Sequence, residues 1–199
     1  MKKTLILFIL VLEIFYLFSC APLRKKSCET QFLTIVKESQ QKKKIKKVRG
    51  SIYIKGVLLL FNASLENGTE IALFTPVGSK IAQFIEKDKE VCLIIKNKKI
   101  CGEAGEMYKR AFSEEIPFSL TTIILGQFNI SPDSKYSCEN GVITIEDNGK
   151  IFIYENNLLK KIIFKDFSLE YEYENGKIKK VVLKINNHSL AKLFIKDIE

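Results

Sequence analysis

The five cysteines are the residues of this 199-residue chain whose chemistry is easiest to anticipate. Cys92 and Cys101 flank a short apolar stretch that is typical of a β-hairpin, and a two-residue turn midway between them would place their side chains directly opposite each other. In an exported chain such a pair forms a disulfide, and we predict the Cys92–Cys101 bond. Cys28 and Cys138 would by elimination form a second bond, although free buried thiols are the alternative.

Other side chains that could carry chemistry are sparse. The chain has one histidine, His188, in a segment typical of a turn, and it has no Cys-x-x-Cys spacing, so we expect no metal site. The sequence contains no Gly-x-Ser-x-Gly motif, no glycine-rich phosphate loop and no His-Glu-x-x-His motif. It therefore predicts no catalytic residues, no enzyme and no cofactor.

The remaining cysteine, Cys20, ends a segment typical of a signal peptide. Two lysines precede an almost continuous apolar run of 15 residues, Thr4–Phe18, which is shorter than the roughly 20 residues that span a bilayer. Leu17-Phe18-Ser19-Cys20 resembles the lipobox of bacterial lipoproteins, which implies removal of residues 1–19 and three acyl chains on Cys20. Two or more chains anchor a protein stably, at about 0.8 kcal/mol per buried CH₂. An ordinary signal peptide with a chance cysteine is the alternative.

The charge of the chain limits its partners. The formal net charge is +9, and +8 of it belongs to the part from Cys20 onward, because two lysines and one glutamate precede that residue. A basic surface is attracted to anionic lipid head groups. Nucleic acid is not an expected partner of an exported protein. The lysine-rich stretch Lys42–Arg49 is either a solvated surface or a contact with head groups.

Helices and antiparallel strands account for the rest of the chain. Residues 20–27 form a lipidated tether, and residues 28–199 are long enough for one domain, which begins with an amphipathic helix at Glu29–Gln41. Strand patterns return after Gly141, and between the two sets of strands the sequence predicts two short helices. We expect an α+β fold, a single curled antiparallel sheet of about eleven strands that forms an incomplete β-barrel closed by short helices.

One predicted turn sets the register of two strands. Asn67-Gly68 is the strongest turn signal in the chain, and a two-residue turn there places Phe61 beside Phe74 on an almost wholly apolar face. Such a face meets either a solid core or a ligand cavity. Together with the apolar helix after Pro117, it supplies the candidates for a cavity lining, which are Leu59, Phe61, Phe74, Phe118, Ile123 and Ile124.

A second candidate site is the connection after Phe74. Pro76 and Gly78 favour a tight turn, and we expect Val77 between them to point outward. A single exposed valine usually means little, but in an acyl-anchored protein it could enter the bilayer.

Taken in order, several segments resemble the LolB family of outer-membrane lipoprotein receptors, which is related in fold to the periplasmic carrier LolA. The matching segments are the leading helix, Arg49-Gly50-Ser51, the strand and loop Glu70–Ser79, Glu106-Met107, Ile116-Pro117-Phe118 and Ile124-Leu125-Gly126. Val77 stands where leucine is more usual in the family, and the tryptophan often found in the later helix is absent.

The resemblance implies an incomplete barrel around an apolar acyl-chain cavity, in a monomer that is lipid-anchored to the bacterial outer membrane and faces the periplasm. It also implies that the protein accepts lipoprotein cargo from a periplasmic LolA-like carrier and inserts it into the membrane, assisted by the loop Pro76-Val77-Gly78. The alternatives are a structural or envelope-assembly lipoprotein without a transferable ligand, or a lipid- or glycolipid-transport lipoprotein on the same fold.

Overall fold

The computed structural model describes residues 27–41, 45–66, 68–87, 90–96, 98–112 and 116–199. The predicted signal peptide at 1–19, the lipidation site Cys20 and all but the last residue of the tether 20–27 lie outside the described residues. Within the described part, no helix combines the length and the apolar character needed to cross a bilayer.

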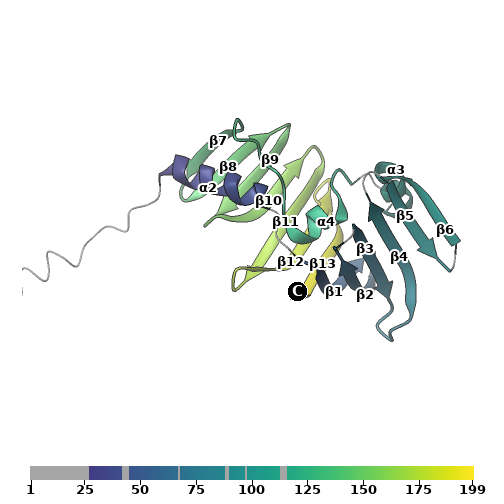
Figure 1. The fold of residues 1–199 in the computed structure, drawn as a ribbon. Coiled ribbons are helices and arrows are strands. Elements are labelled where there is room, and N and C mark those ends of the chain that lie inside the picture. Colours follow the sequence, from purple (N-terminus) through teal and green to yellow (C-terminus); the bar gives the residue numbers. More distant parts are fainter. Residues whose placement is uncertain (1–26, 42–44, 67, 88–89, 97, 113–115) are drawn as a thin grey trace, which may run out of the picture.

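One antiparallel sheet of 13 strands dominates the described residues (Figure 1). The first six strands are β1 (Lys47–Ile54), β2 (Val57–Ser64), β3 (Thr69–Phe74), β4 (Lys80–Lys87), β5 (Glu90–Ile95) and β6 (Lys98–Glu103). The others are β7 (Lys135–Glu139), β8 (Val142–Asp147), β9 (Lys150–Glu155), β10 (Leu158–Phe164), β11 (Phe167–Glu174), β12 (Lys177–Ile185) and β13 (His188–Ile198).

The strand order shows that the sheet is open. It runs from β6 back to β1, then from β13 back to β7, so β6 and β7 are its two edges. All neighbours are also consecutive in sequence except β1 and β13, which pair antiparallel in the middle of the sheet from Val48 opposite Ile198 to Ile54 opposite Ala191. The predicted single antiparallel sheet is therefore present, and it is not closed into a barrel.

The sequence prediction of about eleven strands missed β7. All five of its residues are exposed, and Lys135-Tyr136-Ser137-Cys138-Glu139 has no apolar alternation. A strand at the edge of a sheet pairs on one side only and need not bury a face, so its sequence carries little of the usual strand signal.

In the described part of the chain, three helices accompany the sheet: α2 (Cys28–Gln40), α3 (Ala104–Phe112) and α4 (Leu120–Leu125). Helix α2 begins after Ser27, whose side chain accepts a hydrogen bond from the backbone N–H of Thr30 at 3.2 Å. It contacts β7, whereas α3 contacts β5 and β6 at the other end of the sheet (Figure 1). The predicted helix from Pro117 begins only at Leu120, because Ser119 is its N-cap and has an extended backbone.

The predicted register of β2 and β3 is wrong by one residue. Ser64 lies opposite Glu70 and Phe61 opposite Leu73, so the connection is longer than a two-residue turn; Asn67 lies outside the described residues. A shift of one residue exchanges the two faces of a strand. Phe74 therefore pairs with Leu60 on the outer face, and Leu73 takes the inward position that the prediction gave to Phe74.

The glycine at position 50 permits the central strands to pack. A Cβ atom there would lie 2.1 Å from the carbonyl oxygen of Phe194 on β13 and 2.8 Å from the ring of Phe61 on β2. Both distances are shorter than any real contact, so a larger residue would push β1 away from β13 or Phe61 out of the core. Gly50 is also where the β1–β13 register shifts.

Two disulfides secure the edges of the sheet. Cys28 of α2 bonds to Cys138 of the edge strand β7, with Cα atoms 5.9 Å apart. Cys92 of β5 bonds to Cys101 of the other edge strand, β6, and the two residues are directly opposed in register. These are the pairs that the sequence indicated. The first bond ties β7, which pairs with one strand only, to α2, whereas the second reinforces the pairing of β6 with its one neighbour, β5.

The two disulfides should differ in their contribution to stability. The sequence separations are 110 and 9 residues, and loop-closure entropy gives about 4–5 kcal/mol for Cys28–Cys138 and about 2–3 kcal/mol for Cys92–Cys101. We expect the double variant Cys28→Ser/Cys138→Ser to lose more free energy of unfolding than Cys92→Ser/Cys101→Ser, measured by urea denaturation without reductant. The opposite order would show that strain or residual structure, and not loop length, decides.

Candidate functional site

A wholly apolar cavity lies between the inner face of the sheet and α4. Its volume is about 80 Å³. The lining residues are Ile52, Ile54, Leu59, Phe61, Ile71, Leu73, Phe84, Ile116, Leu120, Ile123, Ile124, Leu183, Leu190, Ala191 and Leu193. They come from both sides of the β1–β13 pair and from α4 with the segment before it. We call this site the inner cavity.

The structure brings four of the six predicted lining residues to the inner cavity. Leu59 and Phe61 contribute from β2, and Ile123 and Ile124 from α4. Phe74 does not line the inner cavity, because the observed register of β2 and β3 places it on the outer face of the sheet. The residues that the prediction missed belong largely to β1, β3, β12 and β13, which pairing over long sequence distances brings to the same face.

Phe118, the sixth predicted residue, is buried outside the inner cavity in an aromatic cluster. Its ring meets Phe128 edge to face at 5.1 Å between centroids, and Phe167 at 5.7 Å. The ammonium of Lys150 lies 5.5 Å from the centre of the Phe118 ring. Phe118 thus anchors the segment before α4 to the far half of the sheet, and its predicted place in the cavity is wrong.

A signal for some of the missed residues was present in the sequence. Val181, Leu183 and Ile185 alternate along β12 with lysines at 180 and 184, which predicts that one face of this strand is buried. The structure places Leu183 on the inner cavity. Nothing in the local pattern, however, indicates that this face lies against β1 and β2.

Helix α4 is held over the inner cavity by polar contacts at both of its ends. The Tyr171 hydroxyl donates a hydrogen bond to the carbonyl oxygen of Ile123 at 3.0 Å. The hydroxyls of Thr69 and Thr121 also form a hydrogen bond. Ile123 and Ile124 are almost fully buried beneath. Because α4 has only six residues, these contacts and its buried side chains fix its position.

A buried carboxyl group lies beside the first turn of α4. Glu86 points inward from β4, and one of its oxygens accepts a hydrogen bond from the Tyr108 hydroxyl of α3 at 3.0 Å. Burial raises the pKa of Glu86, while the Tyr108 hydroxyl and the backbone N–H groups of Leu120 and Thr121 act in the opposite direction. The carboxyl group therefore links β4 to α3 and lies beside the first turn of α4.

The loop between β3 and β4 holds Val77 away from the molecule. The backbone N–H of Thr75 bonds to the carbonyl of Ser79 at 2.9 Å, and that of Gly78 bonds to the carbonyl of Thr75 at 2.9 Å. Gly78 has φ of 88°, which favours glycine. These bonds make a compact turn, and Val77 at its tip is 89% exposed.

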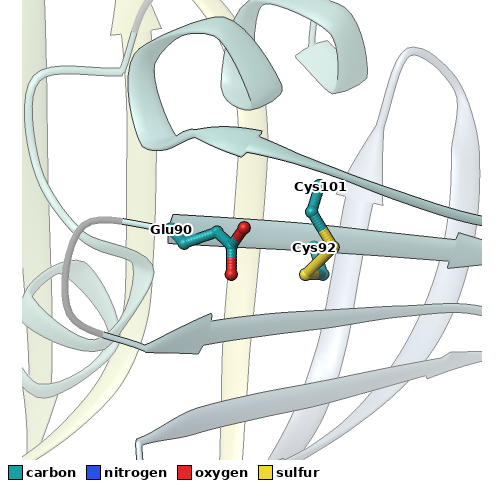
Figure 2. A group of neighbouring side chains, drawn as sticks. All are labelled: Glu90, Cys92 and Cys101. Atoms are coloured by element: carbon teal, nitrogen blue, oxygen red, sulfur yellow. A yellow bond between two sulfur atoms is a disulfide. The ribbon is translucent and has the colours of Figure 1, made fainter.

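One group of side chains has the spacing of metal ligands. Figure 2 shows Glu90, Cys92 and Cys101, whose ligand atoms lie within 4.8 Å of one another. The two sulfurs are joined in the disulfide, so neither is a thiolate and only the Glu90 carboxylate could bind a cation. The group does not constitute a metal site in this oxidation state.

Comparisons with known proteins give distant matches. No protein-family model matches the chain, and no curated protein matches it significantly. Among solved structures it is similar to a LolA superfamily protein of Nitrosomonas europaea, with 10% identity over 86% of this chain and 92% of the other and a TM-score of 0.46. It is also similar to the lipoprotein LppX of Mycobacterium tuberculosis, with 7% identity over 87% and 96% of the two chains and a TM-score of 0.35.

Replacing Glu86 should change how stability depends on pH. The raised pKa means that the folded protein binds this proton more tightly than the unfolded chain does, so the group stabilises the fold most below its unfolded pKa. That stability is lost as the pH rises through the folded pKa. We expect the free energy of unfolding of Glu86→Gln, relative to the wild type, to increase from pH 4 to pH 7.

Urea denaturation at several pH values measures this difference. Glu139→Gln, which removes a carboxyl from an exposed position on β7, is the control and should show no comparable trend. A difference for Glu86→Gln that stays constant or falls with pH would mean that burial does not dominate the energetics of this group.

Proposed function

We propose that this protein binds acyl chains in the inner cavity, beneath α4, and that it does so at a membrane surface. The observation that carries the proposal is the lining of the cavity, which is apolar on the sheet side and on the helix side alike. An apolar chain gains about 0.8 kcal/mol for each CH₂ group that it buries, and it requires no polar partner. No catalytic residue is needed, because transfer of such a chain only exchanges apolar area.

The size of the inner cavity requires that α4 move when a chain enters. Its volume of about 80 Å³ is well below the 300–1,000 Å³ of ordinary ligand sites. Exposing Ile123 and Ile124 would cost about 3–6 kcal/mol, which about four to eight buried CH₂ groups would offset. An acyl chain is long enough to supply them. In the structure, α4 occupies the space that such a chain would take.

The finer part of the proposal is delivery of lipoproteins to the outer membrane. It is supported by the lipobox at Cys20, by the sequence resemblance to LolB, and by the compact loop that displays Val77. Under this proposal the protein is anchored through Cys20 and faces the periplasm. It receives acylated cargo from a soluble LolA-like carrier and releases the cargo to the bilayer beside the Val77 loop.

One observation favours the alternative of a structural lipoprotein without a transferable ligand. With α4 in place, the space between this helix and the sheet has little free volume, as in a solidly packed protein. The two possibilities differ in whether an added acyl chain can displace α4.

Binding of a fluorescent fatty-acyl probe separates them. We expect the chain without residues 1–20 to bind the probe with near-stoichiometric saturation. Ala191→Phe should weaken binding about tenfold or more, because the ring would occupy the inner cavity that Ala191 lines. The control Ala72→Phe adds the same ring on the outer face of β3 and should bind normally. Absence of saturable binding to the wild type would favour the structural alternative.

The Val77 loop can be tested separately. Because Val77 is 89% exposed, Val77→Glu should leave the free energy of unfolding unchanged. We expect it to slow transfer of an acylated lipoprotein from the protein to liposomes about tenfold or more, since a charge replaces an apolar side chain that enters the bilayer. Leu33→Glu makes the same change on the exposed side of α2 and is the control. Normal transfer by Val77→Glu would exclude the proposed role of the loop.

A further inference from the structure

A second cavity lies on the other side of α4, and its character differs from that of the inner cavity. Its volume is about 520 Å³, within the range of small-molecule sites. The walls are the C-terminal half of α2 with Ile45, the segment that follows α4, and the ends of strands β9 to β13. Leu125 and Gly126 border it, while Ile123 and Ile124 of the same helix border the inner cavity. We call this second site the tyrosine cavity.

Hydrogen bonds hold two walls of the tyrosine cavity together. The Ser39 hydroxyl at the end of α2 accepts a hydrogen bond from the backbone N–H of Ile130 at 3.2 Å, and it donates one to the carbonyl of Val36 at 2.7 Å. The Tyr171 hydroxyl fixes Ile123 from the sheet side. The cavity is therefore a feature of the folded core and not a gap between loose segments.

The hydroxyl of a mostly buried tyrosine is accessible from the tyrosine cavity. Tyr154 is only 8% exposed and lines the cavity from β9. Its hydroxyl makes no hydrogen bond with any residue that the structure describes, and it is not fully buried, since the fully buried unpaired side-chain oxygens there belong to Glu86 and Ser134. The hydroxyl is therefore accessible from the cavity, and a ligand that enters can form a hydrogen bond with it.

Tyr173 provides a second phenol on the same wall. It lines the cavity from β11, and the ammonium of Lys160 lies 5.6 Å from the centre of its ring. Burial raises the pKa of Tyr173 to about 12, and burial also raises the pKa of Tyr154. Both phenols are therefore neutral at physiological pH, and each can donate one hydrogen bond and accept others.

Charges at the rim disfavour an ionic ligand. The Glu38 carboxylate of α2 lines the cavity and lies close enough to Tyr154 to help raise its pKa, so an anion there would be repelled. Lys177, the first residue of β12, also lines the cavity, and a cation beside it would be repelled. The remaining polar side chains are also neutral: the amides of Gln41, Gln127 and Asn157 and the hydroxyl of Ser39. A neutral group that both donates and accepts hydrogen bonds satisfies all of these partners.

We propose that the tyrosine cavity binds a neutral, hydroxyl-rich group, a sugar or glycerol unit, that hydrogen-bonds to Tyr154 and Tyr173. Such a group could come from a free sugar or from the head of a lipid whose chains enter the inner cavity across α4; the second source rests on the acyl-binding function proposed above. Binding of a free sugar would require only the tyrosine cavity.

Photolabelling of the mature protein, purified from membranes and placed in phospholipid nanodiscs, tests the proposal. The probe is octyl glucoside bearing a diazirine, and mass spectrometry locates the label. We expect label on peptides that contain Tyr154 or Tyr173. In Tyr154→Phe, which removes only the hydroxyl, the probe concentration for half-maximal labelling should rise about 3- to 10-fold, since one hydrogen bond is lost. Tyr53→Phe, on the outer face of β1, is the matched control and should not change.

Competition identifies the source of the group. Suppression of labelling by free glucose supports a free sugar, and suppression only by unlabelled alkyl glucoside supports a lipid head. Equal labelling of the same peptides by an alkyl phosphocholine of matched length, or unchanged labelling in both Tyr154→Phe and Tyr173→Phe, would overturn the proposal. A diazirine fatty acid, run in parallel, reports on α4 and the inner cavity. If the fatty acid does not label α4 or the inner cavity while the glucoside labels normally, the acyl-binding function is rejected and the tyrosine cavity is supported as an independent site.

Discussion

The pairing of the first strand with the last is the constraint on which the rest of the structure depends. Each half of the chain forms a meander of consecutive strands, and only the β1–β13 ladder joins the halves into one sheet. This pairing places β6 and β7, which are neighbours in sequence, at opposite edges. The segment between them must therefore cross the inner face of the curled sheet. That segment carries α3 and α4, and its crossing is what covers the inner cavity and separates it from the tyrosine cavity.

The crossing segment is held by a small number of polar contacts and by its buried side chains. A helix of six residues has almost no stability of its own. Its position depends on the Tyr171–Ile123 and Thr69–Thr121 hydrogen bonds and on the Glu86 carboxyl group, each of which contributes only about 0.5–1.5 kcal/mol net. Glu86 is costly to bury as an anion. An element held in this way can be displaced by a ligand that supplies comparable apolar contact, whereas the strands beneath it cannot.

The open sheet has two free edges, and free edges invite pairing with other chains. In this protein a disulfide lies at each of them: β6 is bonded to β5, and β7 is bonded to α2. Both edges are also short and largely exposed, and β6 begins with Lys98 and Lys99. The same disulfide that secures β7 fixes α2, whose other end forms a wall of the tyrosine cavity. Edge protection and the shape of that cavity thus depend on one bond.

The sequence by itself determined the features that are local in the chain. Alternation and Asn-Gly-type turns located all strands but β7, the hairpin around Cys92 and Cys101 indicated their pairing, and Pro76 and Gly78 predicted that Val77 would be exposed.

Tertiary structure alone decided which strand faces meet. The β1–β13 pairing joins residues that are far apart in sequence, a single extra residue in a turn moved Phe74 to the outer face, and Phe118 found aromatic partners on β10 and β11. Periodicity defines two faces for each strand, but only packing against distant strands selects which face is buried. The place of Tyr154 in the tyrosine cavity arises in the same way, because no local pattern indicates that a mostly buried tyrosine lines a cavity.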